Sequence, residues 1–125
     1  MLQVSFEKYT GKTNGNERSI AKELFETMNE LAEDYTNTYE DADNFHFVLW
    51  SLSYDFRRGN FETNMWYNSK AGTMAGVVYE TMQDFSKENK GYFPPDEWQE
   101  AIGWMLDDYA EGLDSEIDKR YSTPA

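Results

Sequence analysis

The stretch FHFVLWSLSYDF, residues 45–56, decides which fold the sequence predicts. It is rich in aromatic and branched side chains, which are enriched in β-strands. Its even positions stay large from His46 through Trp50 to Phe56, while its odd positions change from phenylalanine and leucine to serine and aspartate. This pattern predicts a strand that is buried on both faces at its start and on one face later, with Trp50 in the core.

The residues after this stretch predict a partner strand. RRGN (57–60) has the composition of a turn, and FETNMWY (61–67) brings aromatic side chains back. Two such segments joined by a short glycine-containing turn are typical of a hairpin. We therefore expect an antiparallel hairpin over about residues 45–67.

Amphipathic segments flank the hairpin on both sides. Apolar side chains recur in them at steps of three and four residues, which is the period of one helical face. The three apolar stripes run through Ile20, Leu24, Met28, Leu31 and Tyr35, through Met74, Val77, Val78, Met82 and Phe85, and through Trp98, Ile102, Met105, Tyr109 and Leu113. TNTYEDADN (36–44) is expected to be a loop. The sequence thus predicts a single α+β domain, residues 1–125, in which a small antiparallel sheet packs against about three helices.

The composition is that of a folded protein without thiol chemistry. Hydrophobic residues make up 39% and aromatic residues 17% of the 125 residues, which argues against disorder. The absence of cysteine excludes a disulfide framework, a thiolate metal site and a cysteine nucleophile. No apolar run has the length of a signal peptide or of a membrane span, so we expect a cytoplasmic protein with no membrane association.

Negative charge is concentrated in two segments. Residues 23–43 hold eight acids and residues 96–118 hold nine, and neither segment contains a lysine or an arginine. The net charge of −13 therefore comes from these two segments alone, since the rest of the chain has more bases than acids. One explanation is that the charge keeps the protein in solution, and the other is that it matches a cationic protein partner. Direct binding of nucleic acid is disfavoured, because contact with phosphates needs a basic face.

The candidate binding residues come from these two segments. Acids that lie off the apolar stripe of a helix face either solvent or a partner. An exposed tryptophan beside acids is typical of an interface, because the ring contributes affinity and the charge steers the approach. On these grounds the candidate partner-binding residues are Glu26, Glu30, Glu33 and Asp34 in the first segment, and Trp104, Asp107, Asp108, Glu111 and Asp114 in the second.

The sequence contains no catalytic or cofactor signature. His46 is the only histidine, and its apolar surroundings favour a structural role. Neither YEDADN (39–44) nor GLDSEID (112–118) has the glycine and glutamate positions of a calcium-binding EF-hand loop. Phosphate-binding glycine motifs are also missing. We therefore predict no catalytic residue, no metal site and no cofactor, and an enzyme built on carboxylates alone is only a third alternative.

Three stretches resemble the antirestriction proteins of the KlcA/ArdB type. They are LAEDY (31–35), the aromatic stretch 45–56, and EWQEAIGWMLDDYA (97–110). The resemblance implies a small acidic α+β domain from a mobile element that blocks type I restriction enzymes. This chain departs from the family in having RRGN where the family has a serine-asparagine-glycine-glycine turn. The segment VVYETMQDF (77–85), following the expected hairpin, is also similar to small phage accessory proteins.

Together the charge and the resemblance predict a non-enzymatic inhibitor. Its acidic segments would occupy the basic groove of a nucleic-acid-processing enzyme, as phage and plasmid anti-defence proteins of the antirestriction or anti-CRISPR type do, either by imitating DNA or by complementing its binding site. The alternative is an immunity protein or antitoxin that neutralises one cognate toxin nuclease.

Overall fold

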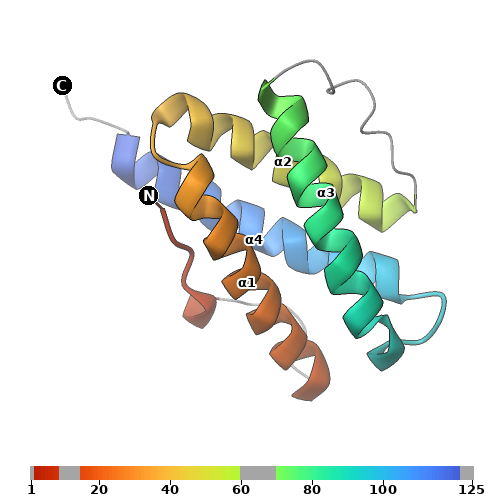
Figure 1. The fold of residues 1–125 in the computed structure, drawn as a ribbon. Helices are drawn as coiled ribbons and strands as arrows, with labels where there is room; N and C mark the ends of the chain where they lie inside the picture. The colour runs from red at the N-terminus through yellow and green to blue at the C-terminus, as the bar shows by residue number, and fades with distance from the viewer. Residues whose placement is uncertain (1, 9–14, 60–69, 122–125) are drawn as a thin grey trace.

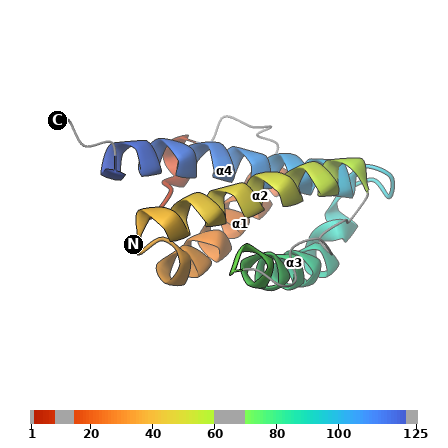
Figure 2. The ribbon, with the colours of Figure 1, turned by 90° about the horizontal axis from the view of Figure 1, so that it is seen from above.

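The chain folds as a bundle of helices in two layers. The computed structural model describes residues 2–8, 15–59 and 70–121. Its long helices are α1 (Gly15–Tyr35), α2 (Tyr39–Arg58), α3 (Lys70–Asn89) and α4 (Trp98–Tyr121), and the short 3₁₀ helices η1 (Phe6–Lys8) and η3 (Lys90–Tyr92) precede α1 and follow α3. α2 and α4 lie side by side in one layer, and α1 and α3 cross over this pair on the same side (Figures 1 and 2). One core cluster takes apolar side chains from all of the long helices.

The predicted α+β fold is wrong. The described ranges contain no strand, and residues 45–56, expected to be the first strand of a hairpin, lie inside α2. Residues 39–44, expected to belong to a loop, form the first turns of the same helix. The expected second strand, residues 61–67, lies outside the described residues. Over the ranges that the structure describes, the regular structure is therefore helical throughout.

Signals at both ends explain why α2 is a helix. Thr38 caps its start, with the hydroxyl oxygen accepting a hydrogen bond of 3.1 Å from the backbone N–H of Asp41. Acids lie in the first turn and two arginines in the last, where each sign is favoured by the helix dipole. Gly59 ends the helix with φ 67°, a left-handed conformation that glycine adopts without strain. These signals outweigh the strand propensity of the aromatic side chains between them, because propensity is a weak preference that context overrides.

The buried side chains of α2 follow the helical period and not the alternation. They are Ala42, Phe45, Val48, Leu49, Leu52, Ser53 and Phe56. Trp50, which the strand pattern placed in the core, is 51% exposed. The expectation of a buried Trp50 is therefore wrong, because a helix turns by about 100° per residue and points this side chain outward.

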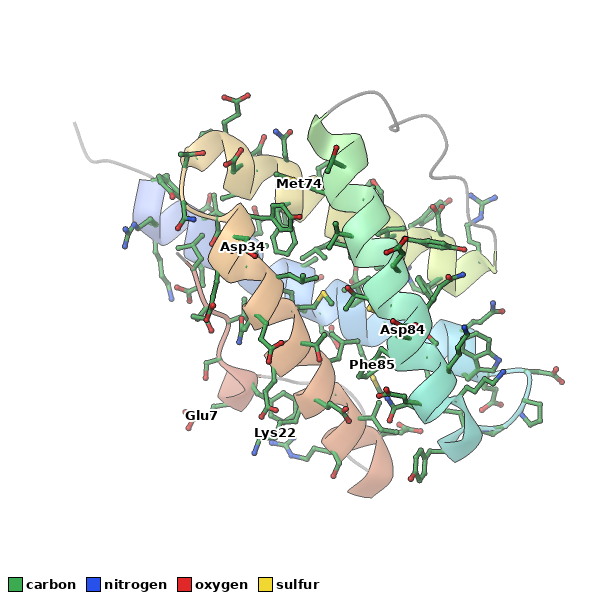
Figure 3. The ribbon with its side chains drawn as sticks, viewed as in Figure 1. Glu7, Lys22, Asp34, Met74, Asp84 and Phe85 are labelled. Carbon is green, nitrogen blue, oxygen red and sulfur yellow. The ribbon has the colours of Figure 1, made fainter. Side chains whose placement is uncertain are left out.

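The three expected helices are all present. In α1 the side chains of Ile20, Leu24 and Met28 are buried. In α3 the buried residues Met74, Val78, Met82 and Phe85 continue the predicted stripe, and Figure 3 labels Met74 and Phe85 on that helix. In α4 the stripe from Ile102 to Leu113 is buried, and the helix continues through Gly112 to Tyr121. Helical periodicity alone was sufficient to predict these elements.

α2 and α4 run antiparallel, and they approach each other closely where Gly103 of α4 faces Ser53 and Arg57 of α2. A Cβ atom on Gly103 would lie 2.7 Å from Arg57 Cγ and 3.0 Å from the carbonyl oxygen of Ser53. At the other end of the pair the rings of Tyr39 and Tyr121 lie 5.5 Å apart. The absence of a side chain at Gly103 thus sets how closely the two helices approach.

The N-terminal segment packs against α1 and α4 without forming a strand. Leu2 and Val4 are buried, and their backbone N–H groups donate to side chains of α1 and of the residue after it. The N–H of Val4 donates to Asn29 Oδ1 (2.9 Å), and Asn29 Nδ2 donates back to the carbonyl oxygen of Val4 (3.1 Å). Tyr109 also donates its hydroxyl proton to Asn29 Oδ1 (2.7 Å). Asn29 therefore joins the segment to both helices, and Gly112 leaves room for Val4, since a Cβ there would lie 2.5 Å from Val4 Cγ1.

Adjacent residues of α2 provide a test of the helix assignment. Leu49 is fully buried, so Leu49→Ala should lower the free energy of unfolding by about 2–5 kcal/mol. Trp50 is half-exposed, so Trp50→Ala should lower it by less than about 1 kcal/mol, although more atoms are removed. Urea denaturation of the two variants measures both values. An equal or larger loss for Trp50→Ala would place that side chain in the core, as a strand would.

Candidate functional site

Five acids form a continuous exposed face on α1. We call Glu23, Glu26, Glu30, Glu33 and Asp34 the α1 acidic face; all five are exposed. At 100° per residue they fall within an arc of about 100°. None of the five lies within ion-pair distance of a basic side chain in the described part of the chain. Four of the candidate binding residues, Glu26, Glu30, Glu33 and Asp34, are therefore brought together on one surface, where Figure 3 labels Asp34.

The position of these acids in the helix does not favour stability. Negative side chains are stabilising near the N-terminus of a helix and destabilising near its C-terminus, where the carbonyl ends of the dipole are exposed. Glu33 and Asp34 lie in the last turn of α1, which contains no basic residue. Like charges three and four residues apart also repel each other. The α1 acidic face is thus a cost to the fold that solubility alone could have avoided by using both signs.

The candidate residues of α4 separate into buried and exposed positions. Asp107 is 9% exposed and lies in the contact with α2, where Arg57 Nη2 is 3.9 Å from its Oδ1 and Ser53 Oγ donates to the same oxygen at 3.3 Å. It therefore holds the two helices together and is not part of an open surface. Glu111 and Asp114 are exposed, and Trp104 is 47% exposed.

Asp108 lies half-buried between these two groups. Burial, followed by the negative charges of Glu111 and Asp107, raises the pKa of Asp108 from the usual 3.8 to about 6. Desolvation disfavours the carboxylate form, and the two neighbouring carboxylates add to this effect. At pH 7 Asp108 is still ionised, but the folded protein stabilises this carboxylate less well than water does.

The exposed candidate residues of α1 and those of α4 face opposite sides of the molecule. Tyr109 of α4 points toward α1, since its hydroxyl bonds to Asn29. Glu111 and Asp114 lie within about 40° of the direction opposite to Tyr109 around the helix axis. Because α1 turns its own buried stripe toward α4, the α1 acidic face looks the other way. The candidate residues therefore form two separate surfaces, and one flat partner cannot cover both.

An aromatic face on α2 was missed by the sequence analysis. Phe47, Trp50 and Tyr54 are each 44–51% exposed and lie three and four residues apart along α2. Trp50 and Tyr54 stack with ring centroids 6.4 Å apart. The guanidinium carbon of Arg57 lies 4.1 Å from the ring centroid of Trp104 and 5.6 Å from that of Tyr54, which links α4 to this face. The strand interpretation hid the face, although its helical spacing was readable in the sequence.

The remaining residues considered for chemistry are His46 and the clusters of acids. His46 is half-buried on α2 and not on a strand. In residues 2–8, 15–59 and 70–121 no three His, Asp or Glu side chains converge as a metal site would require. Within the same ranges no helix is long and apolar enough to cross a membrane.

Comparison with protein-family models, with curated proteins and with solved structures finds no match. The α+β fold that the resemblance to KlcA/ArdB-type proteins implied is not the fold of this chain.

The pKa of Asp108 predicts how stability depends on pH. The folded protein keeps the Asp108 proton up to a pH of about 6, whereas the unfolded chain loses it near pH 4. The free energy of unfolding contributed by this group therefore falls as the pH rises through this window and is constant above it. Asp108→Asn removes the ionisation and should be more stable than the wild type at pH 7. Its melting temperature should also fall less than that of the wild type as the pH rises from 4 to 6. Thermal melts across the window measure both effects.

Asp114→Asn is the matched control, because it removes the same charge from an exposed position of the same helix. Equal stabilisation by Asp114→Asn and Asp108→Asn would mean that general repulsion, and not the burial of Asp108, causes the effect.

Proposed function

We propose that this chain is a non-enzymatic binding protein that inhibits a nucleic-acid-processing enzyme by occupying the enzyme's basic groove with the α1 acidic face. The protein would belong to the phage or plasmid anti-defence class and act in the cytoplasm. The observation that carries the proposal is the run of five exposed acids on one helix face, without a basic partner in the described part of the chain. A cationic groove would supply the missing counter-charges.

The spacing of the charges supports a groove that normally holds nucleic acid. The eleven residue steps from Glu23 to Asp34 rise about 16 Å along the helix axis. The mean separation of the five acids along that axis is therefore about 4 Å, with single steps from about 1.5 to 6 Å, and this mean is close to the spacing of about 3.4 Å between the charges of one DNA strand. α1 thus offers a partner the line charge of a single strand.

The exposed residues of α4 form the comparison surface. Glu100, Glu111, Asp114 and Asp118 are exposed on α4 and lie on another side of the molecule than the α1 acidic face. They equal in charge the four α1 acids that are substituted below. Trp104 and Asp108 lie on this second surface, where the aromatic face borders it. An interface on α4 would rely on ring contacts as well as charge, whereas an interface on α1 relies on charge. Substitutions on the two helices therefore separate the two mechanisms.

Neutralising the α1 acidic face should weaken binding and leave the fold intact. The variant Glu26→Gln, Glu30→Gln, Glu33→Gln, Asp34→Asn keeps the size and polarity of the side chains while removing four charges. We expect the association rate with the target to fall about tenfold at low salt, because electrostatic steering is lost, and the melting temperature to stay equal or rise. Wild-type association should slow steeply with salt. Surface plasmon resonance and DNA-cleavage assays with a purified type I restriction endonuclease and an RNA-guided nuclease measure these effects.

The control variant Glu100→Gln, Glu111→Gln, Asp114→Asn, Asp118→Asn removes the same charge from α4 and should retain most of the inhibition. Equal losses for both variants would mean that only net charge matters, which contradicts a role for the α1 face. Inhibition of neither enzyme, with rescue of cells from one basic toxin nuclease, would replace the proposal with the immunity-protein alternative.

A further inference from the structure

A small cavity opens where three helix ends meet. It has a volume of about 190 Å³ and is lined by Phe56, Gln83, Ser86, Lys87, Lys90 and Trp98. These residues come from the end of α2, from the end of α3 with η3, and from the start of α4, which gather at one end of the bundle (Figures 1 and 2). An apolar cavity of about 150 Å³ is large enough to hold benzene. The cavity can therefore take one aromatic ring with a small substituent.

The walls of the cavity combine two apolar rings with polar groups from a single helix face. Phe56 is 1% exposed and Trp98 is half-buried. Ser86 and Lys87 lie three and four residues after Gln83 and so share one face of α3, and Lys90 follows in η3. A ring between Phe56 and Trp98 would therefore lie with one edge toward these polar side chains.

Ser86 has an unsatisfied hydroxyl group in this wall. The residue is 4% exposed, and its Oγ has no hydrogen-bond partner in the described part of the chain. Other polar side chains of α3 bond to backbone carbonyl groups one turn earlier. Thr81 Oγ1 donates to the carbonyl oxygen of Val77 (2.8 Å), and Asn89 Nδ2 donates to that of Phe85 (2.9 Å). A buried hydroxyl without a partner is unfavourable, and such groups in native proteins call for an explanation. An acceptor atom on a bound molecule would provide one.

The charge at the cavity determines the sign of that molecule. Lys87 and Lys90 are the charged residues of the lining, and no acid contributes to it among the described residues. This is notable in a chain with 24 acids and 11 bases. Lys90 Nζ lies 6.0 Å from the ring centroid of Trp98, so a positive charge sits beside the aromatic wall. The site favours an anion that also has an apolar body.

We propose that this cavity is a binding site for a small aromatic carboxylate. The ring packs between Phe56 and Trp98, one carboxylate oxygen accepts the hydrogen bond from Ser86 Oγ, and Lys87 and Lys90 neutralise the charge. The site is independent of the proposed inhibition, because its lining contains no residue of the α1 acidic face and its charged groups are lysines.

Benzoate is the probe for this proposal, and benzyl alcohol is its neutral counterpart of nearly equal size. Titration of the ¹⁵N-labelled protein, followed through the indole N–H signal of Trp98, should give a Kd for benzoate on the order of 1 mM or tighter. Benzyl alcohol should bind at least about fivefold more weakly, because it cannot pair with the lysines. Added salt should weaken benzoate binding and leave benzyl alcohol unaffected.

Two substitutions in the cavity and one outside it complete the test. Ser86→Ala should weaken benzoate binding about fivefold while raising the melting temperature of the free protein, since it removes the unsatisfied hydroxyl. Lys90→Gln should weaken binding by a similar factor. Lys22→Gln removes the same charge from the exposed surface of α1, where Figure 3 labels it, and should change nothing. Equal binding of the two probes, or full binding by Ser86→Ala and Lys90→Gln, overturns the proposal.

Discussion

The close approach of α2 and α4 at Gly103 is the constraint on which the rest of the structure depends. A Cβ atom at that position would lie 2.7 Å from Arg57 Cγ and 3.0 Å from the carbonyl oxygen of Ser53, so only a glycine fits this contact without a shift. The side chains of the same two residues then meet Asp107, one turn further along α4. The paired helices provide one face for α1 and α3 to cover and leave the other to Trp50, Tyr54 and Trp104. Both the core and the exposed aromatic face thus follow from this contact.

Periodicity in the sequence predicted three of the four long helices but not the class of the fold. The stripes of α1, α3 and α4 have a single reading, since apolar residues at steps of three and four have no strand counterpart. The sequence of α2 fits two interpretations, a strand and a helix. Large side chains occupy its even positions, as in a strand, and also positions three and four residues apart, as on one face of a helix. The capping threonine at position 38, the acids after it and Gly59 would have resolved the ambiguity. The capping signals at the two ends of the segment therefore distinguish a helix from a strand here, whereas the size of the side chains does not.

The candidate site was predictable residue by residue but not as a surface. Charge and helical spacing were enough to place Glu26, Glu30, Glu33 and Asp34 off the apolar stripe. The burial of Asp107 was not predictable, because it depends on a contact with α2 that was expected to be a strand. The orientation of α4 relative to α1 was also hidden, since it is a property of the packing. The cavity between Phe56, Ser86 and Trp98 also depends on how the helices pack, so no pattern in the sequence predicted it.

The acids of the α1 acidic face have no basic partner in the described part of the chain and work against the fold, which is explained if they are retained for recognition. The salt dependence of stability tests this claim without knowledge of a partner. We predict that the free energy of unfolding at pH 7, measured by urea denaturation, rises as sodium chloride increases from about 0.01 to 0.2 M, because screening relieves repulsion among like charges. A free energy of unfolding that falls over this range would show that the acids take part in stabilising ion pairs, and would contradict the account.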